Sequence, residues 1–253
     1  MNGLAGKRAV VTGGGSGIGA GIAAALAQSG ADVVIVGRRK ETLDAVAARH
    51  PGISAREVDV TDEPAMAELF SALTDAGRAP DIVVANAGAA ASAPIARTEL
   101  ALWRDMVETN LTGTFLTFRS ALVRMRKDRP GRLIAVASTA GLKGYPYVSA
   151  YCAAKHGVIG LVRSMAAELA RTQITVNAVC PGFTETPLLE QSIATIGAST
   201  GLTASDVRRS LLSNNPQGRF IAPSEVAGAV LWLCSSEAGS VTGQALSISG
   251  GEI

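Results

Sequence analysis

The stretch VVTGGGSGIGAGIAAALAQSG, residues 10–30, runs from a β-branched strand through a glycine-rich turn into an alanine-rich helix. Glycines at positions 13, 17 and 19 let the backbone turn sharply and approach a bound phosphate closely, while the helix N-terminus offers unpaired N–H groups and a positive dipole end. A turn that only packs a helix closely would explain one or two glycines, whereas five of the seven residues from 13 to 19 are glycine. The stretch therefore predicts a dinucleotide-binding turn that opens an α/β fold.

The rest of the chain alternates short β-branched runs with longer segments rich in alanine and leucine. We expect strands at 8–12, 32–37, 54–60, 81–88, 131–138, 174–180 and 245–250, and helices at about 18–29, 40–49, 63–76, 99–127, 150–171 and 224–235. Such alternation implies right-handed crossovers and a parallel sheet covered on both faces. The pattern predicts α/β architecture: a single-domain Rossmann fold over residues 1–253, with a doubly wound, mostly parallel seven-stranded sheet and helices on both faces.

One region breaks this alternation. From 187 to about 223 no strand pattern occurs, but two helical pieces, LLEQSIATIG and ASDVRRSLL, lie between Gly, Asn and Pro interruptions. An insertion of this length in a compact domain is usually functional, for example as a cover over a ligand. We expect a substrate lid at about 187–223.

Composition argues against several kinds of partner. A formal net charge of +2, with 17% charged residues and no long basic or acidic tract, gives no support for binding nucleic acid or a membrane surface. The longest apolar runs fall well short of the roughly 18 residues that cross a bilayer, and the first residues lack an apolar secretion segment. The three cysteines and two histidines show no metal-ligand spacing. We expect a cytoplasmic protein with no metal, whose cysteines are small buried residues.

The end of the second strand bears on the choice of dinucleotide. An acidic residue about 20 residues beyond the glycine turn normally binds the adenosine ribose of NAD. In VIVGRRKE that position is Gly37, and Arg38 and Arg39 follow it. Two guanidinium groups without a carboxylate suit a 2′-phosphate, because arginine offers a bidentate fork and stacks on adenine. The sequence favours NADP(H), with NAD(H) possible; a solvated arginine pair at a strand end is the alternative.

The stretch SAYCAAKHG, residues 149–157, places Tyr151 and Lys155 one helical turn apart on the same face. Hydride transfer to a carbonyl builds negative charge on oxygen, so the reaction needs a proton donor in place. Tyr151 would be that general acid, and the nearby ammonium of Lys155 would lower the tyrosine pKa. Ser138, at a strand end, would donate a second hydrogen bond to the same oxygen. Alone, the tyrosine and lysine are also compatible with an accidental surface pair, and Ser138 with a turn serine.

At this point the residues resemble the short-chain dehydrogenase/reductase family across essentially the whole chain. TGGGSGIG is similar to its TGxxxGIG motif, ANAG at 85–88 to its NNAG motif with Ala85 replacing the first asparagine, and PGFTET at 181–186 to its nicotinamide-side motif. The resemblance implies a catalytic tetrad of Asn110, Ser138, Tyr151 and Lys155. Asn110 would hold a water that returns protons to Lys155; a locally satisfied helix asparagine is the alternative.

The resemblance also implies roles in binding the cofactor. Asp59 and Val60 would contact adenine, Thr184 and Thr186 would hold the carboxamide, and Lys155 would bind the nicotinamide ribose. Together with the glycine turn and the two arginines, the expected cofactor-binding residues are Gly13, Ser16, Gly17, Ile18, Gly19, Arg38, Arg39, Asp59, Val60, Asn86, Ala87, Gly88, Tyr151, Lys155, Pro181, Gly182, Thr184 and Thr186.

The substrate is less well defined. ITVNAVCPGFTETP and VTGQALSISGG resemble β-ketoacyl thioester reductases, which implies NADPH-dependent reduction of a 3-ketoacyl thioester of coenzyme A or acyl carrier protein. The basic segment RMRKDRPGR (124–132) would meet the phosphate or the carrier. Of the two carrier-contacting arginines of that subfamily, Arg129 is present and the other is Thr172, beside Arg171. Tyr145 and Tyr147 lie where the family places substrate-side loop residues; exposed loop aromatics are the alternative.

Several alternatives stay open. A 3-hydroxyacyl-CoA or secondary-alcohol dehydrogenase working oxidatively would use the same residues. A non-catalytic NADP(H)-sensing regulator would need the fold but not the acid and its partner. The family resemblance also implies a homotetramer built through the helices at 99–127 and 150–171 and the last strand.

Overall fold

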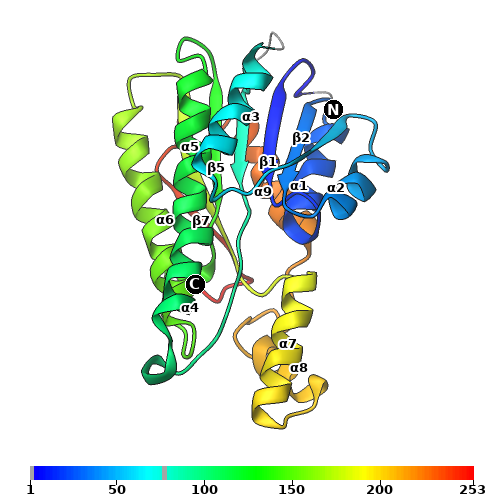
Figure 1. The fold of residues 1–253 in the computed structure, drawn as a ribbon, viewed down its shortest axis with the longest axis vertical. Helices are drawn as coiled ribbons and strands as arrows, with labels where there is room; N and C mark the ends of the chain where they lie inside the picture. The colour runs from blue at the N-terminus through cyan, green and yellow to red at the C-terminus, as the bar shows by residue number, and fades with distance from the viewer. Residues whose placement is uncertain (1–2, 76–78) are drawn as a thin grey trace.

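The computed structural model describes residues 3–75 and 79–253 (Figure 1). Within them, seven parallel strands form one sheet in the order β3-β2-β1-β4-β5-β6-β7. Their bounds are β1 Arg8–Thr12, β2 Asp32–Gly37, β3 Ile53–Glu57, β4 Ile82–Ala85, β5 Gly131–Val136, β6 Ile174–Pro181 and β7 Ala245–Ile248. The predicted doubly wound α/β fold is confirmed, and the sheet is parallel throughout.

Helices cover both faces of this sheet, as the apolar strands require. Helices α3 (Glu63–Asp75), α5 (Gly113–Arg124) and α6 (Ser149–Glu168) bury side chains in the core on one face, and α1 (Gly17–Gln28), α2 (Lys40–Ala47) and α9 (Pro223–Cys234) do so on the other. The remaining elements are η1 Ile95–Arg97, α4 Leu100–Val107, η2 Glu108–Thr112, η3 Thr139–Gly141, α7 Pro187–Thr200 and α8 Ala204–Leu212. The three cysteines are buried free thiols, as predicted.

Two strands end earlier than predicted. The run at 54–60 is a strand only over Ile53–Glu57, and the run at 81–88 only over Ile82–Ala85. After Ala85 the backbone N–H groups of Asn86 and Ala87 both bond to the Thr12 hydroxyl, at 3.0 Å each, instead of continuing the ladder. The apolar run therefore continues past the sheet into a loop that lies against the glycine-rich turn.

The single helix predicted at 99–127 is wrong in its middle. Helix α4 passes into a π-helical turn, η2, before α5 begins. In a regular α-helix the backbone N–H of Asn110 would bond to the Met106 carbonyl, but the side-chain amide of Asn110 takes that carbonyl at 2.9 Å. A side chain that inserts into the helical ladder in this way widens the turn, and such π turns are frequent at functional sites.

The region from 187 to 223 folds as a pair of helices, α7 and α8, which project beyond the sheet at the lower end of Figure 1. Thr186 caps the start of α7, and Gly201, in the left-handed conformation with φ of 74°, ends it. The pair has a small apolar core of its own, separate from the cores of the sheet, which consists of Leu189, Ile193, Val207 and Phe220.

Candidate active site

The candidate residues gather at the carboxyl ends of the strands. The strand order reverses between β1 and β4, and in open α/β sheets ligands bind in the crevice at such a point. The turn after β1, the loop after β4, Ser138 after β5 and the loop after β6 all open on this edge. The topology thus brings together motifs that lie far apart in the sequence.

The glycine-rich turn is held by the loop after β4. Asn86 donates from its side-chain amide to the carbonyls of Thr12 and Gly13, at 2.9 and 3.2 Å. Gly13 has φ of 65°, and a Cβ there would lie 2.7 Å from that amide, so only glycine fits. The side chain of Asn86 therefore shapes the turn. Thr12 and its hydroxyl were not among the predicted site residues, although the threonine begins the TGGGSGIG motif.

The turn has the features that a dinucleotide pyrophosphate requires. Helix α1 begins at Gly17 with no acidic residue in its first turn, and the side chain of Ser16 makes no capping hydrogen bond. The N–H groups and the dipole of α1 therefore face the turn without competition from a carboxylate. These residues fit a dinucleotide phosphate.

The adenosine end is marked by charged residues after β2 and β3. Arg38 and Arg39 are exposed, and the Arg38 guanidinium lies 3.6 Å from the Asp59 carboxylate. Partial burial opposes ionisation of Asp59, but hydrogen bonds from Thr61 and the charge of Arg38 together lower the pKa of Asp59. The side chain of Val60 is buried in the core against Gly113. Contact of Asp59 and Val60 with adenine stays a prediction.

Asn110 and Lys155 meet beside Gly88. A Cβ on Gly88 would lie 2.7 Å from Asn110 Oδ1 and 3.6 Å from Lys155 Nζ, which explains the glycine. Asn110 is fully buried; its amide donates to the Ala89 carbonyl at 3.0 Å, and its Oδ1 accepts from the Ala89 N–H at 3.3 Å. Asn110 therefore fixes the loop after β4 next to Lys155. Its expected role in holding a water stays a prediction.

Ser138, Tyr151 and Lys155 form the centre of the candidate site. The Ser138 side chain is hydrogen-bonded to Tyr151 and accepts from the Ala140 N–H at 3.1 Å. Lys155 is buried and donates to the Val136 carbonyl at 3.0 Å, with Nζ 5.7 Å from the centre of the Tyr151 ring. The hydroxyl groups of Ser138 and Tyr151 are thus held together, and the Lys155 ammonium lies close to them.

Tyr151 does not have the lowered pKa that its position near Lys155 predicts. Burial raises the pKa of Tyr151 above its usual value, although the hydrogen bond with Ser138 acts to lower it. Burial also lowers the pKa of Lys155 to about 8. For both groups burial has a larger effect on the pKa than neighbouring charges or hydrogen bonds, because the charged form loses part of its hydration.

This arrangement suits proton donation to a carbonyl oxygen. A bound reduced nicotinamide would supply the hydride. A phenol whose pKa is raised stays protonated at neutral pH, so Tyr151 holds the proton that an alkoxide oxygen requires. Ser138 can donate to the same oxygen and orient it, and the Lys155 ammonium favours the negative charge that develops there.

The loop after β6 closes the crevice. Thr184 donates to the Gly182 carbonyl at 3.0 Å, and Thr186 donates to the Thr184 carbonyl at 3.2 Å. A Cβ on Gly17 would lie 3.1 Å from Thr186, which places this loop next to the dinucleotide turn. Both hydroxyl groups thus have partners within the loop, and contact with a carboxamide stays a prediction.

The two tyrosines before α6 have different surroundings. Tyr145 is partly buried, and its hydroxyl lies 2.8 Å from that of Thr139 and 2.5 Å from Glu252. Tyr147 is exposed with φ of 67°, and its carbonyl accepts from the Ala93 N–H at 2.7 Å. Positive φ in a bulky residue is strained and frequent at functional sites. Glu252 was not predicted as a site residue.

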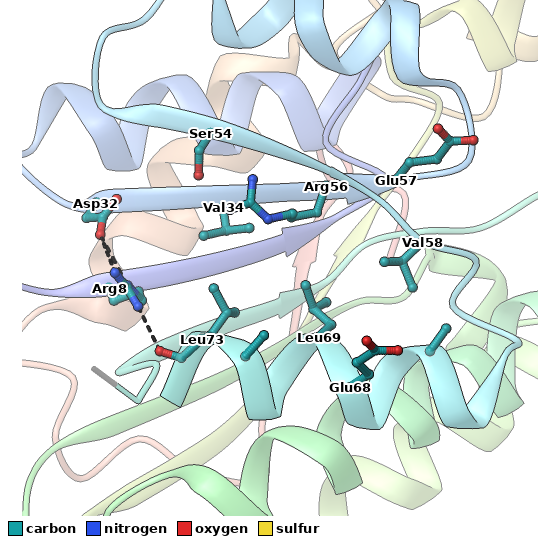
Figure 2. A pocket seen from close by; sticks show the side chains of 12 residues that line it. Arg8, Asp32, Val34, Ser54, Arg56, Glu57, Val58, Glu68, Leu69 and Leu73 are labelled. Carbon is teal, nitrogen blue, oxygen red and sulfur yellow. Dashed lines mark hydrogen bonds and ion pairs between the residues drawn. The ribbon is translucent and has the colours of Figure 1, made fainter. Parts of the chain in front are cut away.

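A cavity of about 430 Å³ lies elsewhere, between β3 and α3 (Figure 2). Arg8 bridges the Asp32 carboxylate and the Leu73 carbonyl at one end of it, and Arg56 and Glu68 line its wall. None of the four catalytic candidates lines this cavity. The candidate site is therefore not this cavity but the group of side chains at the carboxyl ends of the strands.

The basic segment 124–132 lies at the other end of the sheet. It joins the end of α5 to the start of β5, and Arg129 pairs with Asp81, just before β4, at 3.6 Å. Thr172 precedes β6 at the same edge. The six residues of β5 separate this segment from Ser138 by about 20 Å. A thioester bound at Tyr151 therefore does not lie directly beside this segment of the same chain.

Comparisons with known proteins agree with this geometry. A family model described as "Enoyl-(Acyl carrier protein) reductase" matches residues 13–252. The chain is 36% identical to D-beta-hydroxybutyrate dehydrogenase of Rhizobium meliloti, over 97% of this chain and 98% of that protein. It is also 36% identical to a 3-oxoacyl-acyl-carrier-protein reductase of Aquifex aeolicus, over 98% of each chain.

Among solved structures, a variant of actinorhodin polyketide ketoreductase with NADPH superimposes with a TM-score of 0.93, at 35% identity over 97% of each chain. Fold, motif order and full-length similarity agree with one another. The chain belongs to the short-chain dehydrogenase/reductase family and is an oxidoreductase that interconverts carbonyl and alcohol groups.

Proposed function

We propose that this protein is an NADPH-dependent reductase of a 3-ketoacyl thioester. The observation that carries the proposal is the hydrogen-bonded pair Ser138 and Tyr151, backed by the buried Lys155, at the carboxyl edge of the sheet. Such a pair meets one ketone oxygen with two hydroxyl donors. The relatives named as 3-oxoacyl and polyketide ketoreductases support a ketone next to a thioester.

The proposed cofactor is NADPH, and NADH is the less favoured alternative. Support comes from the exposed Arg38 and Arg39 after β2, where no carboxylate occupies position 37. A 2′-phosphate would compete with Asp59 for Arg38, because a dianionic phosphate attracts a guanidinium more strongly than one carboxylate does.

The test is a panel of substrates, followed through the absorbance of reduced nicotinamide. Acetoacetyl-coenzyme A, the same acyl group on acyl carrier protein, simple ketones and crotonyl-coenzyme A are each offered with NADPH and NADH. The proposal expects the ketoacyl thioesters with NADPH to have the highest kcat/KM. Preference for crotonyl-coenzyme A would favour an enoyl reductase, and tight NADPH binding without turnover of any substrate would favour a sensor.

The reverse direction has support from relatives that are named as dehydrogenases. D-beta-hydroxybutyrate dehydrogenase is named for oxidation of a hydroxy acid, so 3-hydroxybutyrate and its coenzyme A ester are assayed with NADP⁺ and NAD⁺. Faster oxidation with NAD⁺ than reduction with NADPH would replace the proposed function with that of an alcohol dehydrogenase.

The proposed lid is the pair α7 and α8. Both follow directly from the loop that carries Thr184 and Thr186, and Ile221 pairs with Thr184 at the base of the pair. A separate small core lets such a pair move as a unit without opening the sheet. We assign it the role of covering the acyl part of the substrate.

The proposed assembly is a homotetramer. Exposed apolar side chains on α4 and α5, namely Trp103, Phe115 and Val123, favour burial against another chain. Multi-angle light scattering would give the mass in solution, and a monomer at micromolar concentration would exclude this assembly.

The substrate panel also distinguishes the acyl carriers, because it offers the same acyl group on coenzyme A and on acyl carrier protein.

A further inference from the structure

A buried carboxylate lies behind the catalytic loop. Glu252 belongs to the segment that follows β7, and its side chain is only 2% exposed. The Tyr145 hydroxyl donates to Glu252 Oε1 at 2.5 Å, and Lys143 Nζ lies 3.0 Å from the same oxygen. A buried carboxylate is costly unless it is paired and hydrogen-bonded. Glu252 has both kinds of partner, and both come from the loop between Ser138 and Tyr151.

The contacts continue to the residue beside Ser138. Tyr145 has one hydroxyl proton, which Glu252 accepts, so the Thr139 hydroxyl must donate to the Tyr145 oxygen across their 2.8 Å separation. Thr139 is buried and follows Ser138 directly. The chain of hydrogen bonds therefore runs from Glu252 through Tyr145 to Thr139.

Glu252 also touches the opposite wall of the crevice. A Cβ on Gly182 would lie 3.3 Å from Glu252 Oε2, and the ring of Phe183 meets that of Tyr145 edge to face with 6.3 Å between centres. One carboxylate thus connects the loop after β5 with the loop after β6. These two loops carry the catalytic serine and the nicotinamide-side motif.

We propose that Glu252 is a positioning residue for carbonyl reduction, acting through Tyr145 to hold the loop that carries Ser138 at its reacting distance from the loop after β6. Tyr145 itself does not serve as the proton donor, because its one hydroxyl proton is already donated to Glu252 Oε1. Displacement of a catalytic group by about 1 Å can cost up to about a hundredfold in rate. The role rests on the carbonyl reduction proposed above, but not on the identity of the acyl carrier.

A double-mutant cycle tests this role. Glu252→Ala, Glu252→Gln, Tyr145→Phe and the combination of Tyr145→Phe with each Glu252 variant are compared with wild type, using acetoacetyl-coenzyme A and NADPH. Glu68→Ala, an exposed glutamate on α3, is the control. If wild type reduces a different ketone better, the cycle is run with that ketone, so failure of the substrate assignment stays distinct from failure of the role of Glu252.

We expect Glu252→Ala and Tyr145→Phe each to lower kcat roughly tenfold, and the double variant to lose no more than the worse single one, since the pair acts as a unit. NADPH binding, followed by fluorescence, should change less than about twofold. Glu252→Gln should restore part of kcat, because its amide oxygen still accepts from Tyr145. With NADPH deuterated at the transferred position, the isotope effect on kcat should rise in the slow variants, since hydride transfer becomes rate-limiting.

Two results would overturn the role of Glu252. One is wild-type kcat in both Tyr145→Phe and Glu252→Gln. The other is an additive loss in the double variant with an unchanged isotope effect, which indicates two independent structural defects. If Glu252→Ala does not fold, the cycle of Glu252→Gln with Tyr145→Phe gives the same decision.

Discussion

Lys155 lies one helical turn from Tyr151, with its Nζ 5.7 Å from the centre of the tyrosine ring. Lys155 is buried and Tyr151 is partly buried, and this burial lowers the pKa of the lysine to about 8 and raises that of the tyrosine. Near neutral pH the pair is therefore an ammonium beside a protonated phenol. This is the protonation state that a reductase needs before the carbonyl oxygen becomes negative.

Tyr151→Phe should abolish nearly all turnover and keep cofactor binding. The substitution removes only the hydroxyl, and general acids contribute roughly 10²–10⁴-fold to rate. Steady-state reduction gives kcat, and NADPH fluorescence gives the dissociation constant in the same preparation. Residual activity above about a tenth of wild type would show that another group supplies the proton.

Lys155→Met should change how stability depends on pH. The pKa of Lys155 is about 8 in the folded protein and 10.5 in the unfolded chain, so the unfolded chain binds more protons between these values. Wild type should therefore gain stability as pH rises through 8, by about 1 kcal/mol between pH 7 and 9 relative to Lys155→Met. Urea unfolding of both proteins at several pH values measures this difference. A constant difference across the range would contradict a lowered lysine pKa.

Arg38→Ala should weaken NADPH binding roughly tenfold or more and leave NADH binding nearly unchanged, because a charge-assisted hydrogen bond to phosphate contributes about 1.5–3 kcal/mol. Arg49→Ala, an exposed arginine just beyond α2, is the matched control. Titration of wild type and variant with each cofactor gives the change in the dissociation constants of NADPH and NADH. Equal losses for NADPH and NADH would mean that Arg38 does not bind the 2′-phosphate.

Ile193→Ala should loosen the pair α7 and α8 without unfolding the sheet. Ile193 is 3% exposed in the separate small core, and removal of a buried isoleucine side chain costs about 2–5 kcal/mol locally. Hydrogen exchange should rise over 187–223 alone, with a higher KM for the thioester and unchanged NADPH binding. Ile22 lies on α1 and is buried in the core against the sheet. Ile22→Ala should therefore lower the stability of the whole domain. If hydrogen exchange rose equally in the sheet, the pair α7 and α8 would not unfold independently of it.

Residues whose role is local could be predicted from the sequence. The glycine-rich turn requires glycine for steric reasons at Gly13, and the pair Tyr151 and Lys155 depends only on helical spacing. Roles that depend on distant contacts could not be predicted. Glu252 meets Tyr145 across 107 residues, and Thr12 meets Asn86 across 74, and no local pattern marks either pair.

The pKa directions also needed the structure. Helical spacing predicts that Lys155 and Tyr151 are neighbours, but it does not predict how far each is buried from solvent. Desolvation and charge attraction act in opposite directions on the tyrosine, and only the folded protein decides which is larger. The interrupted helix at 108–112 was missed for a related reason, because the Ala89 partner of Asn110 lies in another segment.

The π turn at Asn110 makes the site sensitive to a change of a single residue in chain length. A π turn takes in about one residue more than a turn of α-helix, so removing one residue from η2 would restore an ordinary helix and shift which side chain faces the loop after β4. Hydrophobic composition would hardly change, yet the amide that holds Ala89 beside Lys155 would turn away. Deletions here are therefore expected to be more damaging than substitutions of the apolar residues nearby.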